Sequence, residues 1–138
     1  MNHIPKIIIR PVQPENQRYP TPGDWLYDAE SDTLEIRVSR MADYRSELAV
    51  AIHEFFEAVE CLQRDVSEAQ VTAFDLKYED ERADGKHADA DEPGDDKRAP
   101  YREQHIGATW VEREVCVRTG LTWEAHEKNV LDSDELNG

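Results

Sequence analysis

Near the amino terminus, hydrophobic residues follow the two-residue period of a β-strand. The isoleucine-rich segment Lys6–Val12 runs into a proline-containing stretch and is predicted to be a strand. Further along, Glu35 and Arg37 alternate with the apolar residues Leu34, Ile36 and Val38. Such alternation is typical of a half-buried strand. We expect residues 23–28 and 33–39 to form a hairpin and, with the first strand, a small antiparallel sheet.

From about residue 43 the hydrophobic period becomes that of a helix. Apolar residues now recur every three or four positions, at Leu48, Ile52, Phe55, Phe56, Val59 and Leu62. This first helix is expected to end near Arg64. Ser67 followed by Gln70 is the capping-box signature of a second helix.

Two further helices are predicted after residues 84–100, which are rich in glycine, proline and aspartate. This composition indicates an acidic loop or lid rather than a packed element. The third helix follows directly and ends before Gly120, a residue suited to the position just past a helix. Thr122 can cap a short last helix that ends near Leu131. Residues 132–138 are expected to form a flexible tail.

The predicted fold class is therefore α+β, with a small antiparallel N-terminal sheet followed by three to four helices. The chain has 138 residues. This is the length of one domain, so we expect residues 1–138 to share a single core.

Charge narrows the range of partners. The chain carries 31 acidic and 16 basic residues, for a formal net charge of −15. Such a surface repels phosphate backbones and anionic lipids, so we expect no nucleic-acid binding through a basic patch and no membrane binding. The same surface suits a basic partner protein. Where carboxylates lie close together inside the fold, a bound cation can neutralise their mutual repulsion.

The cysteines and the amino terminus indicate a cellular compartment. Cys61 and Cys116 are the only cysteines, and both fall on or near apolar helix faces. Two cysteines make no disulfide framework, so buried free thiols are expected. The first residues lack the apolar run of a signal peptide, and no segment approaches a membrane span. These features predict a cytoplasmic protein.

The first helix carries the chemistry. In the run LAVAIHEFFEAVEC, His53 and Glu57 are four residues apart and therefore project from one helix face, one turn apart. An imidazole nitrogen and a carboxylate oxygen placed in this way can bind one zinc ion. Glu54 points to the flank, where a carboxylate can act as a general base. This is the arrangement of an H-E-x-x-H helix with its second histidine replaced by glutamate.

The third helix offers the remaining ligand. His105 and Glu112 are seven residues apart and share a face, with the small Ala108 between them. Two histidines and one glutamate are a known catalytic zinc set with one position left open. Glu112 is either a partner that orients a histidine or a fourth ligand that closes the site. Asp75 and Glu60 are reserve candidates.

Other interpretations remain open. An H-E-x-x-E motif in a glutamate-rich helix can be a solvated acidic face, although this motif lies inside an apolar run. The acidic loop is a rival ion site, because Asp89, Asp91 and Gly94 match the start of an EF-hand. Pro93 and Pro100 break that match at its fifth and twelfth positions. Three histidines are taken as surface residues without a role: His3, His87 and His126.

The runs HEFFEAVEC, AFDLKYE, DEPGDDKRAPYREQH and AT–VERE resemble a group of small uncharacterised proteins encoded by tailed phages and prophages. The resemblance spans about residues 49–131. It implies a phage origin, hence the host-cell cytoplasm, and an H-E-x-x-E helix paired with a later histidine. It implies no activity. A weaker similarity to zincin-like metallopeptidases covers only the strand-then-helix region, and Glu57 departs from their motif.

Three functions follow as hypotheses. The leading one is a zinc-dependent, peptidase-like metallohydrolase in which Glu54 is the general base. The second is a non-catalytic phage accessory protein, with a structural metal and an acidic surface that binds a host or phage protein. The third is a magnesium-dependent nucleotide pyrophosphatase of the all-helical type, which would use four carboxylates: Glu54, Glu57, Asp75 and Glu79.

Overall fold

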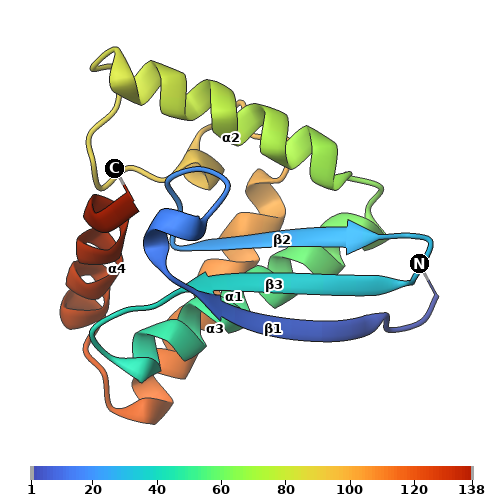
Figure 1. Ribbon diagram of the computed structural model, residues 1–138, viewed down its shortest axis with the longest axis horizontal. Coiled ribbons are helices and arrows are strands. Elements are labelled where there is room, and N and C mark those ends of the chain that lie inside the picture. Colours follow the sequence, from blue (N-terminus) through green and yellow to red (C-terminus); the bar gives the residue numbers. More distant parts are fainter. Residues whose placement is uncertain (1, 138) are drawn as a thin grey trace.

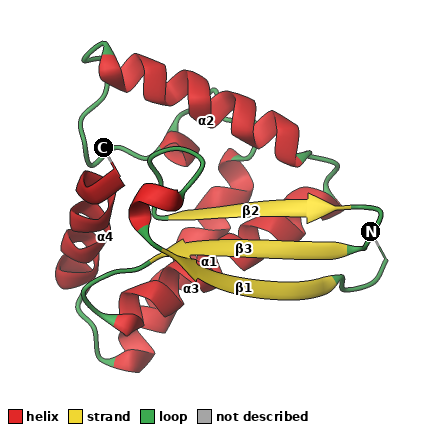
Figure 2. Cartoon of the chain, in the orientation of Figure 1, coloured by secondary structure: helices red, strands yellow, loops and turns green. Residues whose placement is uncertain are grey.

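The computed structural model describes residues 2–137 and confirms the α+β class: a three-stranded sheet is followed by four helices (Figure 1). The strands are β1 (Lys6–Val12), β2 (Gly23–Asp28) and β3 (Thr33–Ser39). The helices are α1 (Tyr44–Gln63), α2 (Glu68–Ala83), α3 (Arg102–Thr119) and α4 (Trp123–Asn137). Two short 3-10 turns, η1 (Pro14–Asn16) and η2 (Pro93–Asp95), interrupt loops and are drawn as short red coils in Figure 2.

The sheet is mixed, not antiparallel throughout. The predicted hairpin is confirmed, since β2 and β3 pair antiparallel. The prediction is wrong for β1, which pairs parallel to β3 and gives the strand order β1-β3-β2. The reason lies in the segment between β1 and β2, which crosses over the end of β3. At that end the Arg40 amide donates to the Val12 carbonyl, where the segment begins, at 2.8 Å. The Ser39 amide donates to the Pro22 carbonyl, where the segment ends, at 2.9 Å. This crossing leaves the middle of the sheet free for β3.

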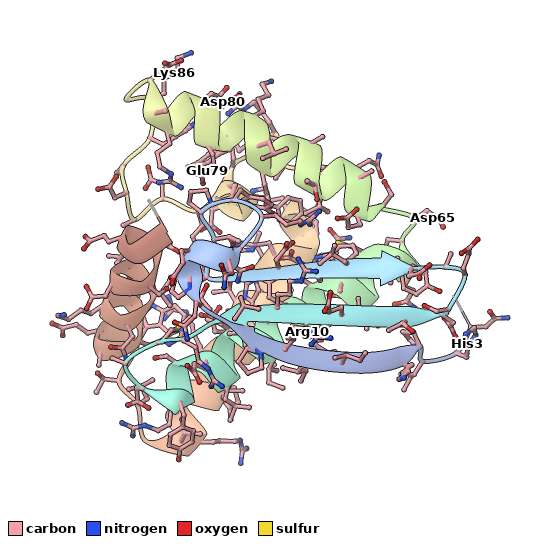
Figure 3. All side chains as sticks on the ribbon, in the orientation of Figure 1. His3, Arg10, Asp65, Glu79, Asp80 and Lys86 are labelled. Carbon is pink, nitrogen blue, oxygen red and sulfur yellow. The ribbon has the colours of Figure 1, made fainter. Side chains whose placement is uncertain are left out.

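One face of the sheet forms the core together with the helices. Leu34, Ile36 and Val38 on β3 are buried, while Arg10 and Glu35 form an ion pair on the outer face (Figure 3). Helices α1 and α3 lie behind the sheet, α2 lies along the edge next to β2, and α4 lies across one end (Figure 1). The close packing of α1 on α3 depends on small side chains at the contact, among them the fully buried Ala108. The core thus surrounds α1.

Helix ends follow the local signals of the sequence. Asp43 caps α1 by accepting from the Arg45 amide at 2.9 Å. Ser67 and Gln70 form the predicted capping box of α2, and Gly120 ends α3 in the left-handed conformation. Each cap satisfies backbone groups that lack a partner within the helix, which sets where each helix can begin or end. Within residues 2–137, no helix has the length and apolar character that crossing a bilayer requires.

Two predicted boundaries are corrected. Helix α4 continues past Leu131 to Asn137, so the predicted tail is helical over residues 132–137, and Gly138 lies outside the described residues. Residues 84–100 do form a loop, but the prediction that it does not pack is wrong, because Gly94 and Ala99 are buried. Ala99 belongs to the main core and Gly94 contacts His105, so this loop is tied to the rest of the fold.

Candidate metal centre

Helices α1 and α3 bring His53, Glu57 and His105 together. The three residues are only 5%, 4% and 6% exposed. Glu57 Oε2 lies 3.2 Å from His53 Nε2 and 3.1 Å from His105 Nδ1. Ligands of a tetrahedral zinc ion, each about 2.0–2.2 Å from the metal, are roughly 3.3–3.6 Å apart. The three ligand atoms lie within 4.8 Å of one another, so this buried group can hold a metal ion.

The carboxylate of Glu57 is held in its ionised form by its neighbours. Burial by itself raises the pKa of Glu57, but hydrogen bonds from His105 and His53 outweigh burial and lower this pKa to about 2. Trp25 Nε1 on β2 adds a longer hydrogen bond of 3.4 Å to Oε1. For His105 burial acts in the opposite direction and lowers the pKa, but the hydrogen bonds to Glu57 and Glu92 outweigh burial and raise this pKa to about 10. A cation binding here therefore displaces a proton from an imidazolium.

Glu112 stands behind His53 and does not face the cation position. Its Oε1 lies 2.7 Å from His53 Nδ1, off the N–H axis, so this is a charge contact rather than an aligned hydrogen bond. It does not join the ligand atoms of His53, Glu57 and His105. The geometry matches a partner that orients a histidine, and it does not match the alternative of a fourth ligand. A proton kept on Nδ1 leaves the Nε2 lone pair of His53 free for a metal.

A buried polar chain extends this arrangement to α4. His126 Nε2 donates to Glu112 Oε2 at 2.5 Å, and His126 Nδ1 lies 3.0 Å from the Ser46 hydroxyl. Asn129 Nδ2 donates to the same hydroxyl at 3.0 Å. Burial raises the pKa of Glu112, but His126 and His53 together lower it to about 2. The chain therefore keeps Glu112 charged and fixed in position beside His53.

The prediction that His126 is a surface residue is wrong, because it is 1% exposed and bonded to Glu112. The sequence carried one usable signal for it: His126 lies four positions after the capping Thr122, which places it in the first turn of α4. His87 is also not free on the surface, since its ring stacks on Tyr78 with centroids 3.8 Å apart and contacts Glu81. His3 agrees with its prediction and pairs with Asp32 in an exposed contact.

Glu54 differs from the other carboxylates of the site in having no partner. It has no hydrogen bond or ion pair within the described part of the chain, and it lines the same cavity as His53, Glu57 and His105. Its side chain lies against Gly23, where an added Cβ would come 2.6 Å from Glu54 Cγ. Burial, followed by the nearby charge of Glu57, raises the pKa of Glu54 well above its ordinary value. A carboxylate in this state is suited to accept a proton.

The cavity measures about 850 Å³, a volume typical of sites that take small ligands or peptide segments. Its walls come from α1, α2, α3, α4, β2 and the 84–100 loop. Carboxylates predominate over the two arginines in its lining, Arg82 and Arg113. Figure 3 shows Glu79, one of these carboxylates, on the side of α2 that faces the fold, while Asp80 lies on the outer side. The site thus opens into an acidic cavity.

The reserve candidates do not join the metal group. Asp75 accepts hydrogen bonds from Tyr19 and Tyr101, and its pKa is raised to about 7, first by burial. Glu79 pairs with Arg82. Among residues 2–137, the carboxylates of the pyrophosphatase hypothesis form no group of three whose oxygens converge, and Glu60 also belongs to none. This hypothesis also expects an all-helical fold, which the sheet contradicts.

Gly94 allows the 84–100 loop to lie flat against His105. A Cβ at this position would come 2.3 Å from His105 Cγ, so no side chain fits without movement. We expect Gly94→Ala to lower the free energy of unfolding by about 1–3 kcal/mol, as overpacking does. Chemical denaturation of the metal-free protein measures this. Ala90→Val adds methyl groups at an exposed position of the same loop and should change stability by less than about 0.5 kcal/mol. Equal effects of the two changes would contradict the close packing.

Comparisons of the chain with protein-family models, with curated proteins and with solved structures give no match. The functional argument therefore rests on the geometry of the site itself.

Proposed function

We propose that this protein is a zinc-dependent hydrolase that cleaves peptide bonds, with His53, Glu57 and His105 as ligands and Glu54 as general base. The observation that carries the proposal is a buried two-histidine, one-carboxylate group next to an unpaired carboxylate in the same cavity. Two histidines and one glutamate are a catalytic zinc set that leaves a coordination position free. A zinc ion held there would polarise the carbonyl group of the peptide bond to be cleaved and would lower the pKa of a bound water.

The residues of this chain divide the remaining work. Glu54 accepts the proton of the attacking water and can return it to the leaving amine. Glu112, held by His126, orients His53 and fixes which of its nitrogens faces the cation. The loop around Gly94 and the buried position of the three ligands limit the access of bulk water. Each of these tasks belongs to a side chain with the burial and partners that the task requires.

Metal content and turnover test the proposal together. Purified protein should contain about one zinc per chain, and His53→Ala should contain almost none, because a ligand is lost. His3→Ala, which removes an exposed histidine, is the matched control and should keep its zinc. Zinc returned to chelator-treated protein should restore cleavage of unfolded proteins or peptides.

Two results would count against this function. Equal zinc in the parent and in His53→Ala would place the metal elsewhere. A stoichiometric metal whose removal lowers the melting temperature, with no cleavage of any peptide tested, would favour the non-catalytic accessory protein.

A further inference from the structure

Both nitrogens of the His105 ring face carboxylates. On one side Nδ1 faces Glu57 in the buried group. On the other side Nε2 lies 3.1 Å from Glu92 Oε2 and 3.6 Å from Asp95 Oδ1. The ligand atoms of Glu92, Asp95 and His105 also lie within 4.8 Å of one another. His105 therefore belongs to two possible sets of cation ligands, one on each side of its ring.

We propose that Glu92, Asp95 and His105 Nε2 form an outer site that captures a divalent cation at the mouth of the cavity and passes it to the buried site. This inference rests on the proposed metal function, because the outer site shares a ligand with the buried one. The cation class is the same at both sites: a divalent ion that accepts oxygen and imidazole ligands.

Burial limits how an ion can reach the inner ligands. They are at most 6% exposed, so an ion reaches them only by way of the cavity that they line together with Glu92 and Asp95. The side chains of Glu92 and Asp95 are 45% and 62% exposed, whereas that of His105 is only 8% exposed. An ion held between them touches solvent on one side and the buried ring on the other.

The position of the loop is fixed, which separates this group from an ordinary acidic surface patch. Gly94 lies between Glu92 and Asp95 and packs directly on the His105 ring. The backbone turn η2 thus holds both carboxylates beside Nε2, a nitrogen on a residue more than nine-tenths buried. The spacings of 3.1 Å and 3.6 Å bracket the roughly 3.3–3.6 Å expected between ligands of one ion.

The chemistry of imidazole makes the two sites successive. A neutral imidazole has one lone pair, so His105 can bind a cation at only one nitrogen at a time. With the ion on Nε2, the proton sits on Nδ1 and is donated to Glu57. After transfer, the ion sits on Nδ1 and the proton on Nε2 is donated to Glu92, which then supports the ligand histidine. During the transfer Nδ1 loses its proton to solvent as it binds the ion, and Nε2 takes a proton from solvent as the ion leaves it.

The rate of metal exchange tests the outer site. In stopped-flow experiments with zinc and a chromophoric chelator, Asp95→Asn should slow both binding and release by about tenfold, the lower end of what local charge does to association rates. The dissociation constant should stay within about threefold, because a group that lowers only the barrier to the buried site changes the rates of binding and release by the same factor. Asp84→Asn removes the same charge from an exposed position of the same loop, outside both the ligand group and the cavity lining, and should leave both rates close to those of the parent.

A second variant isolates the outer site at equilibrium. Glu57→Gln removes a buried ligand, and the protein should retain weak zinc binding that disappears when Asp95→Asn is added. Unchanged exchange rates in Asp95→Asn, or residual binding in Glu57→Gln that Asp95→Asn does not affect, would overturn the outer site alone. A parent protein that binds no divalent cation would instead refute the proposed metal function. The two failures are therefore distinguishable.

Discussion

Glu54→Gln is expected to reduce the turnover number for peptide cleavage by about 10²–10⁴-fold, the usual contribution of a general base. Glutamine keeps the shape of the side chain but cannot accept a proton. Zinc content should not change, because Glu54 lies outside the group of ligand atoms. Steady-state kinetics with zinc-loaded protein and a fluorogenic peptide measure the effect.

The same helix supplies a matched control for Glu54. Glu60 carries the same charge on α1 but does not line the cavity, so Glu60→Gln should retain nearly full activity. A Glu54→Gln protein that turns over at the parent rate would show that another group accepts the proton.

The pH profile gives an independent readout of Glu54. In the metal-free protein, burial and then the charge of Glu57 raise the pKa of Glu54 above its ordinary value of 4.5, and zinc bound to Glu57 would offset the second of these effects. A base must be deprotonated to act, so cleavage by the zinc-loaded parent should be low while Glu54 holds its proton and should rise as pH passes the pKa of Glu54. The residual activity of Glu54→Gln should lack this rise.

The second large effect is expected for the zinc affinity of Glu57→Gln. Loss of a residue that only orients a metal ligand lowers metal affinity by roughly 10–100-fold, and loss of the ligand Glu57 itself should lower it by more. Glu112→Gln supplies that comparison, since Glu112 contacts His53 from behind the site. Isothermal titration with zinc measures both variants. Equal losses for the two changes would contradict the assignment of Glu57 as a ligand and Glu112 as a partner.

Glu57→Gln should also destabilise the metal-free protein, by about 3 kcal/mol, because it leaves two buried imidazoles without their shared counter-ion.

The stabilisation that Glu57 and His105 give the metal-free fold depends on pH in a definite direction. The pKa of Glu57 is lowered from 4.5 to about 2, so its contribution is present above pH 4.5 and is lost as pH falls through 2. The pKa of His105 is raised from 6.5 to about 10, so its contribution is present below pH 6.5 and is lost as pH rises through 10.

The difference between parent and Glu57→Gln should therefore be largest between about pH 4.5 and 6.5 and should shrink toward pH 10. Urea denaturation of chelator-treated proteins across this range measures it. A difference that grows toward high pH would mean that the ion pairs around Glu57 do not stabilise the fold.

On helix α3 hydrophobic periodicity failed, whereas the spacing of His105, Ala108 and Glu112 correctly indicated a shared buried face. Its apolar residues predict an inward face, yet Trp110 is 78% exposed, and Ile106 and Val117 are also exposed. The buried residues of this helix are His105, Ala108, Glu112 and Cys116. Periodicity assumes that apolar side chains determine which face turns inward. On α3 the inward face instead carries the polar groups of the site, and these are stabilised by partners on α1 and α4.

Other features needed contacts between distant parts of the chain. The position of β3 between β1 and β2 depends on how the segment after β1 crosses the sheet, which no local pattern encodes. The contacts of Glu92 and Asp95 with His105 depend on Gly94 packing against the same ring. His126 reaches Glu112 only because α4 folds back along the end of the molecule.

The sequence by itself determined the features that depend on neighbouring residues. These include the ranges of the strands and of α1, the start of α2, the helix caps, the buried free cysteines and the shared face of His53 and Glu57. Helical geometry, strand alternation and capping hydrogen bonds act over at most about four residues, so the chain records them locally. Only the tertiary structure decided the order of the strands, the exposure of Trp110 on α3, the packing of the acidic loop and which nitrogen of each histidine meets which carboxylate. Those depend on packing between segments far apart in the chain, and the residues of any one segment do not determine it.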